Sequence, residues 1–471
     1  MLQASEPRAY KLLHEGVQAL SRVEHAGIRV NVDYLDHTIK ETGEKIKRLQ
    51  NDMRGSAVGK HWRRKYSDKT NFGSGTQLAA VLMELGHELP RTKATENFND
   101  DDKRVRYSTD VSAIENVDDP FVALYLECEK LKKVKDTFLT GIKRETINGF
   151  LHPGFHLHRT RTYRSSSSNI NFQNLPIRNP VQGAIVRKCF IARPGRRIVE
   201  IDYGGIEVCI AACYHKDPRM MTYITDETKD MHRDMAAQCY KLKPAQVAKM
   251  TRYAGKNMFV FPQFYGDYYV SCARALWEWL ERNDLTLKDS DVRVMDNLAR
   301  AGITERGACK PGERPVEGTF ESHIKSVENH FWNKRFPVYK QWKLDWFAKY
   351  QRNGYFVTKT GFRLEGNYGR NDVINYPVQG SAFHCLLQSL IWLQKTLRRR
   401  KMKTLIVGQI HDSIVADVPD NELNDYLEVA DTIMTKRLPS AWDWINVPLE
   451  VEAEVTPVEG NWHEKETMSY G

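Results

Sequence analysis

Hydrophobic positions recur with helical spacing in two long stretches near the start of the chain. Residues 8–52 place apolar residues every three or four positions between charged ones, and residues 110–146 repeat the pattern with a basic segment at 130–135. We therefore expect long charged helices in both stretches. Residues 55–69 are rich in Arg and Lys, and residues 91–107 have the mixed polar composition of a loop. Neither of these two stretches is expected to contribute to a hydrophobic core.

The pattern changes after residue 160, where we expect extended chain followed by a strand and a helix. Residues 160–180 are mostly Ser, Asn and Arg without periodicity, which favours a polar surface segment that binds a ligand. The apolar run at 198–202 predicts a short strand, the glycine pair at 204–205 predicts a turn, and residues 206–215 predict a helix. Asp202 is therefore expected at a strand end.

Two later segments have clear signals of regular structure. Residues 244–261 predict a helix that starts at a proline, where a missing N–H costs nothing, and that meets Pro262 near its end. Two apolar strands are predicted at 404–410 and 413–418, joined through residues 411–412. We find no internal repeat in the sequence.

Composition limits the class of protein. A chain of 471 residues exceeds what one hydrophobic core usually spans, so we expect two or three subdomains. The net charge of +10 favours a polyanionic partner. The eight cysteines form no CxxC pair, which is typical of free thiols in a reducing cytoplasm. Because no apolar run approaches about 18 residues, we expect no membrane span.

Asp202 and Asp412 are the first candidate site residues. An Asp before a helix is commonly an N-cap, and an Asp in a tight turn is commonly there for turn chemistry, so each has a structural explanation. A turn requires neither His411 nor Gln409, and both favour a polar site. Two carboxylates from separate strands suit Mg²⁺, and such a pair can clamp two ions for phosphoryl transfer.

Arg252 and Lys256 lie four residues apart on one face of the helix predicted at 244–261. A solvated helix face is the simpler explanation, although like charges at this spacing repel unless an anion lies between them. Their neighbours are apolar and aromatic, namely Met258, Phe259, Val260, Phe261, Phe264 and Tyr265. The cations therefore border a partly buried surface, where a triphosphate would satisfy both charges and the rings could stack on a base.

Together these residues resemble family A DNA polymerases, in order from about residue 8 to the C-terminus. Residues 202–207, Asp-Tyr-Gly-Gly-Ile-Glu, are similar to the family's motif A, with glycines replacing its Ser and Gln. The resemblance implies that Asp202 bridges two metal ions and that the Tyr203 carbonyl binds one of them. It also implies that Glu207 blocks a ribose 2′-hydroxyl, which favours deoxynucleotides.

Arg252, Lys256 and the aromatic residues after them resemble motif B, the helix that closes on the nucleotide. The spacing differs by one residue from the family pattern. Counting without a gap places Val260 and Phe264 at the two aromatic positions, whereas an extra residue places Phe261 and Tyr265 there. We prefer the second interpretation, with the extra residue absorbed in a π-bulge or kink near Pro262.

Residues 409–413, Gln-Ile-His-Asp-Ser, resemble motif C, in which Ser413 replaces the usual Glu. The resemblance makes Asp412 the second metal ligand. His232, in Asp-Met-His, resembles a histidine that meets the triphosphate. Residues 8–52 and 71–78 resemble the DNA-gripping thumb. The implied DNA-binding residues are Lys133, Arg164, Asn171, Gln173, Asn174, Asn375, Gln379, Gln409 and His411.

The resemblance implies an α+β chain with the right-hand polymerase fold, in which thumb, palm and fingers combine an antiparallel palm sheet with long helices. It assigns 1–160 to the thumb and N-terminal helices and 161–225 to the palm with motif A. The fingers would take 226–350, and the palm with motif C would take 351–471. The fingers include an enlarged stretch at 267–325 that lies outside the resemblance.

The implied function is template-directed DNA synthesis, in which a DNA-directed DNA polymerase adds deoxynucleoside triphosphates to a primer 3′ end by two-metal-ion nucleotidyl transfer. The expected cofactor is Mg²⁺, as two ions, for which Mn²⁺ can substitute. The expected partners are primer-template DNA and deoxynucleoside triphosphates, without a membrane. No Asp-x-Glu exonuclease motif precedes the thumb, so we expect no 3′–5′ proofreading on this chain. Any proofreading would come from a separate exonuclease chain or from sequence outside residues 1–471, and a separate processivity subunit is a further candidate partner. The phage-like motifs favour the cytoplasm of a bacterial host.

Two alternatives compete with a polymerase. A metal-dependent nuclease would use the same aspartate pair, but it would need neither the Arg252 and Lys256 clamp nor Glu207. A non-catalytic DNA-binding scaffold would not need to keep the aspartate pair.

Overall fold

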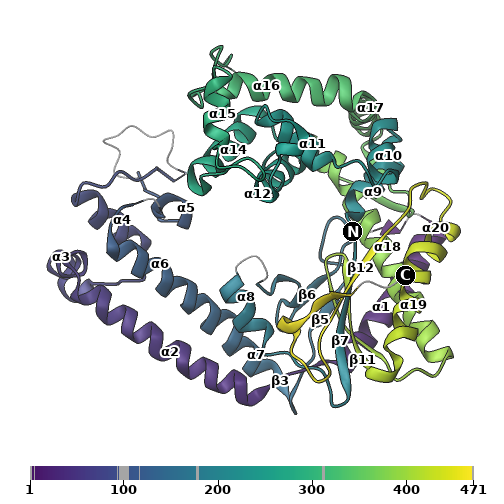
Figure 1. Cartoon of the computed structure of the whole chain (residues 1–471). Coiled ribbons are helices and arrows are strands. Elements are labelled where there is room, and N and C mark those ends of the chain that lie inside the picture. The colour runs from purple at the N-terminus through teal and green to yellow at the C-terminus, as the bar shows by residue number, and fades with distance from the viewer. Residues whose placement is uncertain are drawn as a thin grey trace.

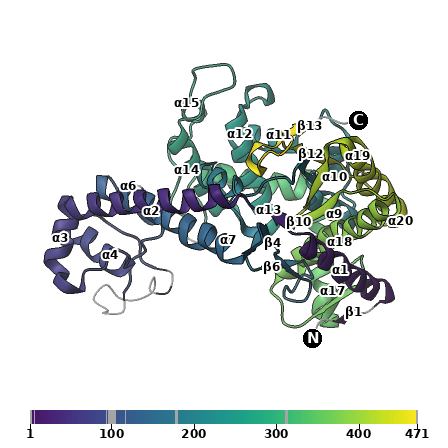
Figure 2. The same cartoon turned by 90° about the horizontal axis from the view of Figure 1, so that it is seen from below.

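The computed structural model describes residues 3–4, 6–92, 94, 105–115, 117–176, 180–309 and 313–468. Its elements form three main groups (Figure 1). The arm (32–145) is the set of helices at the left of Figure 1, and the upper lobe (218–353) is the set at the top. The sheet layer, at the right, is the central antiparallel sheet with its covering helices. Seen from below, the arm extends away from the rest of the molecule (Figure 2).

Five antiparallel strands form the central sheet, in the order β10-β11-β7-β12-β13. They are β7 (Arg196–Tyr203), β10 (Leu405–Ile410), β11 (Ser413–Pro419), β12 (Val451–Val455) and β13 (Glu466–Met468). The expected strand at 198–202 and the expected hairpin at 404–418 are therefore confirmed. Ile198, Val199 and Ile201 are buried because the sheet lies between other elements.

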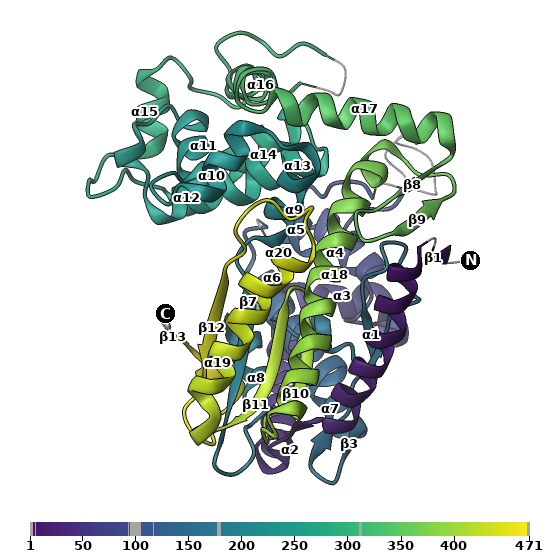
Figure 3. The ribbon, with the colours of Figure 1, turned by 90° about the vertical axis from the view of Figure 1, so that its right-hand side faces the viewer.

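Helices cover one face of this sheet (Figure 3). They are α1 (Pro7–Ala26), α18 (Arg370–Arg399), α19 (Leu423–Asp431), the π-helical η8 (Thr432–Arg437) and α20 (Leu438–Ala441). The apolar residues of α1 and α18 join the main hydrophobic core with those of the strands. One face of the sheet is thus packed against helices.

The arm has a hydrophobic core of its own. Its elements are α2 (Val32–Gly55), α3 (Ala57–Tyr66), η1 (Ser67–Lys69), α4 (Gly75–Glu84), α5 (Val111–Ile114), α6 (Pro120–Lys132), the π-helical η2 (Lys133–Leu139) and α7 (Thr140–Glu145). The expectation that 55–69 adds nothing to a core is wrong. Trp62 is fully buried there, and its Nε1 donates to Oε1 of Gln77 at 2.8 Å. The sequence pattern did not predict the burial of Trp62, because most of its neighbours in α3 are basic.

The first long helical stretch is interrupted. Gly27, with φ of +63°, ends α1, and the short strand β2 (Ile28–Arg29) separates it from α2. β2 pairs with β4 (Phe150–Leu151), which also pairs with β3 (Thr146–Ile147). Most of the loop expected at 91–107 lies outside the described residues.

The regular elements of the upper lobe are helices, joined by loops and one isolated bridge between Thr286 and Arg293 among its described residues. Its elements are α10 (Pro218–Thr225), α11 (Met231–Cys239), η4 (Pro244–Gln246), α12 (Lys249–Ala254), the π-helical η5 (Gly255–Val260), α13 (Phe261–Tyr265), α14 (Tyr269–Asn283), α15 (Val294–Arg300), α16 (Phe320–His330), the π-helical η6 (Phe331–Arg335) and α17 (Pro337–Asn353). Pro262 does not end the helix, because it lies in the first turn of α13, where its missing N–H costs little. The stretch 267–325 supplies α14, α15 and the start of α16, and the rings of Trp277 and Phe320 pack at 5.2 Å.

The segment 160–180 is less superficial than expected. It contains β6 (Ser166–Ser168), paired with β5 (Gly154–His156), and the turn η3 (Phe172–Asn174). Tyr163 and Phe172 are buried, because each ring packs on neighbouring aromatic residues. The helix α8 (Pro180–Arg187) follows.

The remaining elements are short or link the groups. They are α9 (Ile206–His215), the strands β1 (Gln3–Ala4), β8 (Tyr355–Val357) and β9 (Phe362–Glu365), and the turns η7 (Asp420–Glu422) and η9 (Trp462–Glu464). The expected helix at 206–215 is therefore confirmed. Across the described part of the chain, no helix combines the length and the apolar character needed to cross a membrane.

Candidate active site

Asp202 and Asp412 lie close together at one end of the central sheet. Asp202 is the penultimate residue of β7, and Asp412 occupies the two-residue turn between β10 and β11. Asp202 pairs in register with Ser413, the residue after Asp412. The N–H of Tyr203 donates to the carbonyl oxygen of Asp412 at 3.3 Å. The hairpin register thus joins two aspartates that are distant in sequence.

The side chains of Asp202 and Tyr203 point to opposite faces of the sheet, as consecutive strand residues do. The Tyr203 ring is buried on the helical face, where its hydroxyl lies 2.9 Å from Oγ of Ser389. Asp202 consequently faces away from α18, towards the polar side of the sheet.

The electrostatics of the aspartate pair are unusual for surface carboxylates. Although Asp202 is partly exposed, desolvation raises its pKa to about 7, and the neighbouring Asp412 adds to this effect. Burial likewise raises the pKa of Asp412 to about 6, against the opposing influence of Arg164. Among the described residues, no side chain donates a hydrogen bond or forms an ion pair with either carboxylate. Two adjacent, uncompensated carboxylates fit divalent cations, which would supply the missing positive charge.

Few other described side chains near the aspartates could serve as metal ligands. Within the described residues, no group of three or more His, Cys, Asp or Glu side chains could hold a metal ion. A site built on this pair would therefore need additional oxygen ligands from water, backbone or substrate, which is how Mg²⁺ is commonly bound.

Glu207, in the first turn of α9, is the meeting point of several segments. It forms an ion pair with Arg164, and the hydroxyl of Tyr265 donates to its Oε2 at 2.6 Å. The Arg164 Nε donates to the Gln379 carbonyl at 3.3 Å, and Asn375 Nδ2 donates to the Tyr265 carbonyl at 3.2 Å. Burial, followed by the charge of Glu207, raises the pKa of Tyr265. The structure thus brings together these five predicted residues.

The predicted cations lie along α11, α12 and η5. Arg252 pairs with Asp230, with Nε 2.6 Å from Oδ2. Gly255 allows α11 and η5 to approach closely, since a Cβ there would lie 2.8 Å from the His232 carbonyl oxygen. Burial lowers the pKa of His232 to about 4, and the charges of Lys256 and Arg252 contribute. His232 is therefore neutral at neutral pH, while two cations lie near it.

A cavity of about 420 Å³ opens beside these cations. Its lining includes Gly204 and Gly205, which directly follow the strand that carries Asp202, together with Asp230, His232 and Arg252. The turn that follows Asp202 and the helices that carry His232 and Arg252 therefore line one cavity. A second, smaller cavity has Glu207, Phe261, Phe264, Tyr265, Asn375 and Gln379 in its lining.

The expected π-bulge in the motif B helix is confirmed, because η5 is a π-helical turn. Val260 is fully buried in the main core, and Phe264 packs against other aromatic rings of the upper lobe. The Phe261 ring lies 5.3 Å from the Lys256 ammonium, and Tyr265 contacts the Glu207 cluster. This arrangement favours the interpretation that places Phe261 and Tyr265 at the two aromatic positions.

Gln409 organises a second group of predicted residues. Its Oε1 accepts from Ser165 Oγ at 2.6 Å and from Gln173 Nε2 at 2.7 Å, and its Nε2 donates to the His411 carbonyl at 2.8 Å. Asn171 accepts a hydrogen bond from a serine of β6 at 3.0 Å. His411 has φ of +47°, which suits the first position of a two-residue hairpin turn. The polar segment around 165–173 is thus tied to the turn that carries Asp412.

Two predicted DNA-contacting residues lie apart from these clusters. Lys133 is exposed at the start of η2 in the arm, and Asn174 is exposed at the end of η3. In the described part of the chain, neither has a contact with the aspartate pair.

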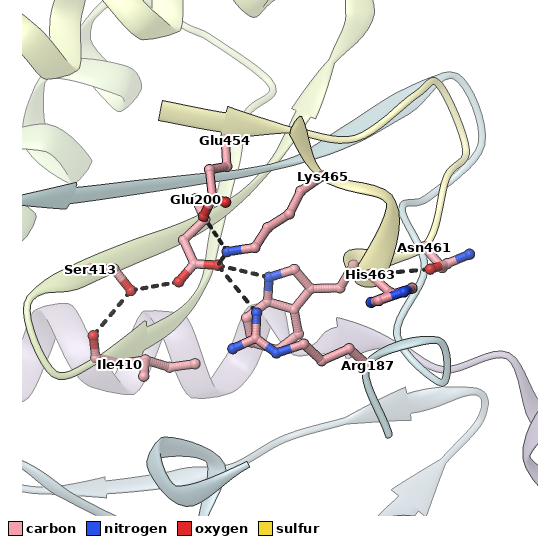
Figure 4. Close-up of polar contacts among 9 residues, drawn as sticks. Arg187, Glu200, Ile410, Ser413, Glu454, Asn461, His463 and Lys465 are labelled. Atoms are coloured by element: carbon pink, nitrogen blue, oxygen red, sulfur yellow. Dashed lines mark hydrogen bonds and ion pairs between the residues drawn. The ribbon is translucent and has the colours of Figure 1, made fainter. Parts of the chain in front are cut away.

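The sequence did not reveal a buried charged cluster around Glu200, which lies two residues before Asp202 on the same strand (Figure 4). Glu200, on β7, is 7% exposed and contacts Lys465, Arg187, Trp462 and Ser413. Burial alone would raise the pKa of Glu200, but Lys465, helped by Arg187 and Trp462, lowers it. The available signal was a glutamate inside an apolar strand, because such a charge requires partners.

Comparisons with known proteins agree with this geometry. The family model described as DNA polymerase family A matches residues 32–278 and 329–464, which leaves part of the enlarged stretch in the upper lobe unmatched. DNA polymerase I of Chloroflexus aurantiacus is 26% identical over 97% of this chain and 43% of its own length. The thermostable DNA polymerase I of Thermus thermophilus is 27% identical over 95% of this chain and 48% of its own length. DNA polymerase of Bacillus phage SP01 is 26% identical over 78% of this chain and 36% of its own length.

The chain spans less than half the length of these three relatives. A solved structure, the POL domain of Pol1 from M. smegmatis in complex with DNA primer-template and dNTP, is similar to it with a TM-score of 0.71. That likeness has 22% sequence identity and covers 96% of this chain and 70% of the other. It shows the expected α+β polymerase fold. Because the family model matches most of its residues, the chain belongs to DNA polymerase family A.

Proposed function

We propose that this chain catalyses template-directed DNA synthesis, adding deoxynucleoside triphosphates to the 3′ end of a primer. The observation that carries the proposal is the pair Asp202 and Asp412, which lie together at one end of the sheet and which no described side chain hydrogen-bonds or ion-pairs. Gly204 and Gly205, just after Asp202, line the 420 Å³ cavity that Arg252 also lines. In this proposal the sheet layer is the palm, the upper lobe is the fingers and the arm is the thumb. The M. smegmatis protein was solved with DNA primer-template and dNTP, which supports the same substrates here.

Asp202, Asp412 and the Tyr203 carbonyl would hold two Mg²⁺ ions, and Mn²⁺ has the same preference for oxygen ligands. When bound, such ions stabilise charge on the attacking and leaving oxygens of phosphoryl transfer. The two aspartates would position these ions, because Asp202 is fixed by β7 and Asp412 is fixed by the hairpin register. The two carboxylates keep their places because the strands under them are buried.

The upper lobe would bind the triphosphate. Arg252 would carry positive charge at the 420 Å³ cavity, Lys256 would add a second charge near His232, and neutral His232 would donate a hydrogen bond without adding charge. The Phe261 and Tyr265 rings would stack on the base. Release of Arg252 from Asp230 would free it for an anion, because that ion pair is partly exposed.

Glu207 would recognise the sugar. Its carboxylate is held between Arg164 and the Tyr265 hydroxyl, so its position beside the smaller cavity is fixed. A fixed carboxylate at that position would exclude a ribose 2′-hydroxyl and favour deoxynucleotides.

The remaining predicted residues would bind the primer-template. Lys133 on the arm would contact backbone phosphates, which makes binding weaker at high salt. The proposed contacts nearer the aspartates are Arg164, Asn171, Gln173, Asn174, Asn375, Gln379, Gln409 and His411.

Primer extension on a primed template with four deoxynucleotides and Mg²⁺ tests the proposal. We expect Asp202→Ala and Asp412→Ala each to reduce the rate at least about 1,000-fold, since bound ions supply several kcal/mol. Asp420→Ala is the matched control, because this aspartate lies just beyond β11 and is half exposed. Extension that persists in both active-site variants would refute the proposal.

The same reaction without deoxynucleotides tests a further part of the proposal, that residues 1–471 do not themselves excise primer 3′ ends. Primer shortening by the wild type that disappears in Asp202→Ala would instead favour a metal-dependent nuclease. DNA binding with neither extension nor shortening would favour a non-catalytic scaffold.

A further inference from the structure

Glu200 occupies a special place relative to the aspartate pair. It lies two residues before Asp202 on β7, so both side chains project from the same face of the sheet. Its register partners are Val415 on β11 and Glu454 on β12. A buried carboxylate therefore lies directly next to Asp202 along the strand.

Both oxygens of Glu200 are engaged (Figure 4). Oε2 accepts from Nε1 of Trp462 at 3.0 Å and from Nζ of Lys465, and Nη1 of Arg187 lies 3.8 Å away. Oε1 lies 3.0 Å from the hydroxyl of Ser413. Two cations and an indole N–H thus fix one oxygen, which leaves the other directed at the start of β11.

Ser413 connects this cluster to the second aspartate. It follows Asp412 directly, and its hydroxyl lies 3.0 Å from both Glu200 Oε1 and the Ile410 carbonyl oxygen. The single hydroxyl proton is shared between these two acceptors, so the hydroxyl connects the turn that carries Asp412 to β7. Glu200 is linked to Asp202 through the strand and to the turn of Asp412 through this hydrogen bond.

The C-terminal segment supplies two of the groups that hold Glu200. Trp462 belongs to η9 and Lys465 follows it, ahead of the edge strand β13. Lys465 also bonds Glu454 on β12, so it spans two strands of the sheet. The Arg187 guanidinium lies 4.6 Å from the Trp462 ring, which closes the cluster from α8. Elements from three distant parts of the chain converge on one carboxylate.

We propose that Glu200 is a positioning residue for the aspartate pair, braced by Lys465, Trp462 and Arg187, and that it acts on the Asp412 turn through the Ser413 hydroxyl. The proposal rests on the proposed function, since it concerns the same metal-binding residues. A rigid link between the two aspartate-bearing segments fixes the separation of their carboxylates. Loss of the link lets the turn move, so divalent cations bind more weakly while the fold persists.

The test is direct titration of the intact chain with Mn²⁺, followed by the electron paramagnetic resonance signal of the free ion, without DNA or nucleotide. We expect Ser413→Ala to weaken Mn²⁺ binding roughly tenfold, because loss of a group that orients metal ligands typically costs 10- to 100-fold in affinity. Ser413→Thr keeps the hydroxyl and is expected to bind like the wild type. Glu200→Gln, which keeps the shape and removes the charge, is expected to weaken binding at least as much as Ser413→Ala.

Thr456→Val is the matched control. Thr456 is equally buried, and its Oγ1 accepts from the Ile198 N–H at 2.9 Å in the same sheet, at the other end of β7. This variant is expected to lower the melting temperature and to leave Mn²⁺ affinity unchanged.

Two outcomes would overturn the inference and can be told apart. Wild-type Mn²⁺ affinity in Ser413→Ala, with Asp202→Ala abolishing binding, would show that the cluster serves the fold alone. Mn²⁺ binding by the wild type that does not depend on Asp202 would overturn both this inference and the proposed metal site.

Discussion

The two ends of the central sheet treat their carboxylates in opposite ways. At one end, Asp202 and Asp412 have raised pKa values, and among the described residues neither carboxylate is in an ion pair. Towards the other end, Asp417 is 2% exposed, and its Oδ2 lies 2.5 Å from Nη1 of Arg193. Glu200, between them, is paired with Lys465 and Arg187. The same sheet thus neutralises some buried charges internally and leaves two for a ligand.

This contrast separates charges that build the fold from charges that bind a ligand. A buried carboxylate that is paired with a cation and hydrogen-bonded is tolerated in the folded protein. Removal of its partner lowers the stability strongly, because the charge stays buried. An unpaired carboxylate pair costs stability in the free protein and is retained only where something else compensates it. The contrast therefore supports the proposal that the aspartate pair binds a ligand.

The largest effect is expected when the buried ion pair between Arg193 and Asp417 is removed. Arg193→Met removes the cation from Asp417 together with a hydrogen bond to the Ala26 carbonyl at 2.6 Å. The free energy of unfolding should fall by about 3–5 kcal/mol, because an uncompensated charge stays buried. Denaturant unfolding followed by circular dichroism measures this change. Adding Asp417→Asn to the variant should restore part of the lost stability. An unchanged denaturation midpoint in Arg193→Met would show that the two ends of the sheet do not differ in this way.

A smaller change in stability, this time a gain, is expected when the charge of Asp202 is removed. The folded-state pKa of Asp202 is about 7, against an ordinary value of 3.8, so the folded state disfavours the ionised form. The penalty is absent below pH about 4, grows as the pH rises, and is fully present above about 7. Asp202→Asn should therefore stabilise the protein at pH 8 without metal, by about 1–2 kcal/mol once solvent screening of a partly exposed group is allowed for.

Thermal melting in a chelator at pH 5 and pH 8 checks this prediction. Mg²⁺ should shrink the advantage of the variant, because a bound cation stabilises only the wild type. Asp420→Asn is the control and should show no such gain at pH 8. An Asp202→Asn variant that is less stable than the wild type at pH 8 would mean that the carboxylate is compensated within the fold.

Much of the aspartate site was predictable from sequence because its signals are local. The apolar run before Asp202 and the paired runs around Asp412 define a strand and a hairpin by themselves. The strand and the hairpin need only neighbouring residues. The π-bulge was predicted from the resemblance, because the spacing after Lys256 exceeds the family pattern by one residue.

The partners of Glu200 were not predictable, since Arg187 and Lys465 reach it only through the completed sheet. Trp62 was missed for a similar reason: one inward ring among basic residues becomes visible only when the other arm helices pack around it. Arg164 was expected to contact DNA, and its ion pair with Glu207 depends on the approach of α9. Long-range charge pairing leaves little trace in local sequence patterns.

The smallest expected effect comes from a matched ion pair at the surface of the same sheet. Arg197 Nε lies 2.5 Å from Asp420 Oδ1, the same separation as between Arg193 and Asp417, and Arg197 also donates to a carbonyl, that of Thr456 at 3.0 Å. The difference is exposure, because the Asp420 side chain is 52% exposed and that of Asp417 is 3% exposed. Arg197→Met should therefore lower the free energy of unfolding by about 1 kcal/mol or less.

Denaturant unfolding at low salt and in 0.5 M NaCl, a concentration that shortens the Debye length to about 4 Å, separates the two pairs. Salt should remove most of the effect of Arg197→Met, since water and ions already screen that pair. It should leave the effect of Arg193→Met nearly unchanged, because the buried pair is screened much less. Equal losses in the two variants would show that hydrogen-bond geometry, rather than burial, determines the cost of removing a cation from this sheet. The unpaired state of Asp202 and Asp412 would then lower the free energy of unfolding only slightly, and it would be weaker support for a bound ligand.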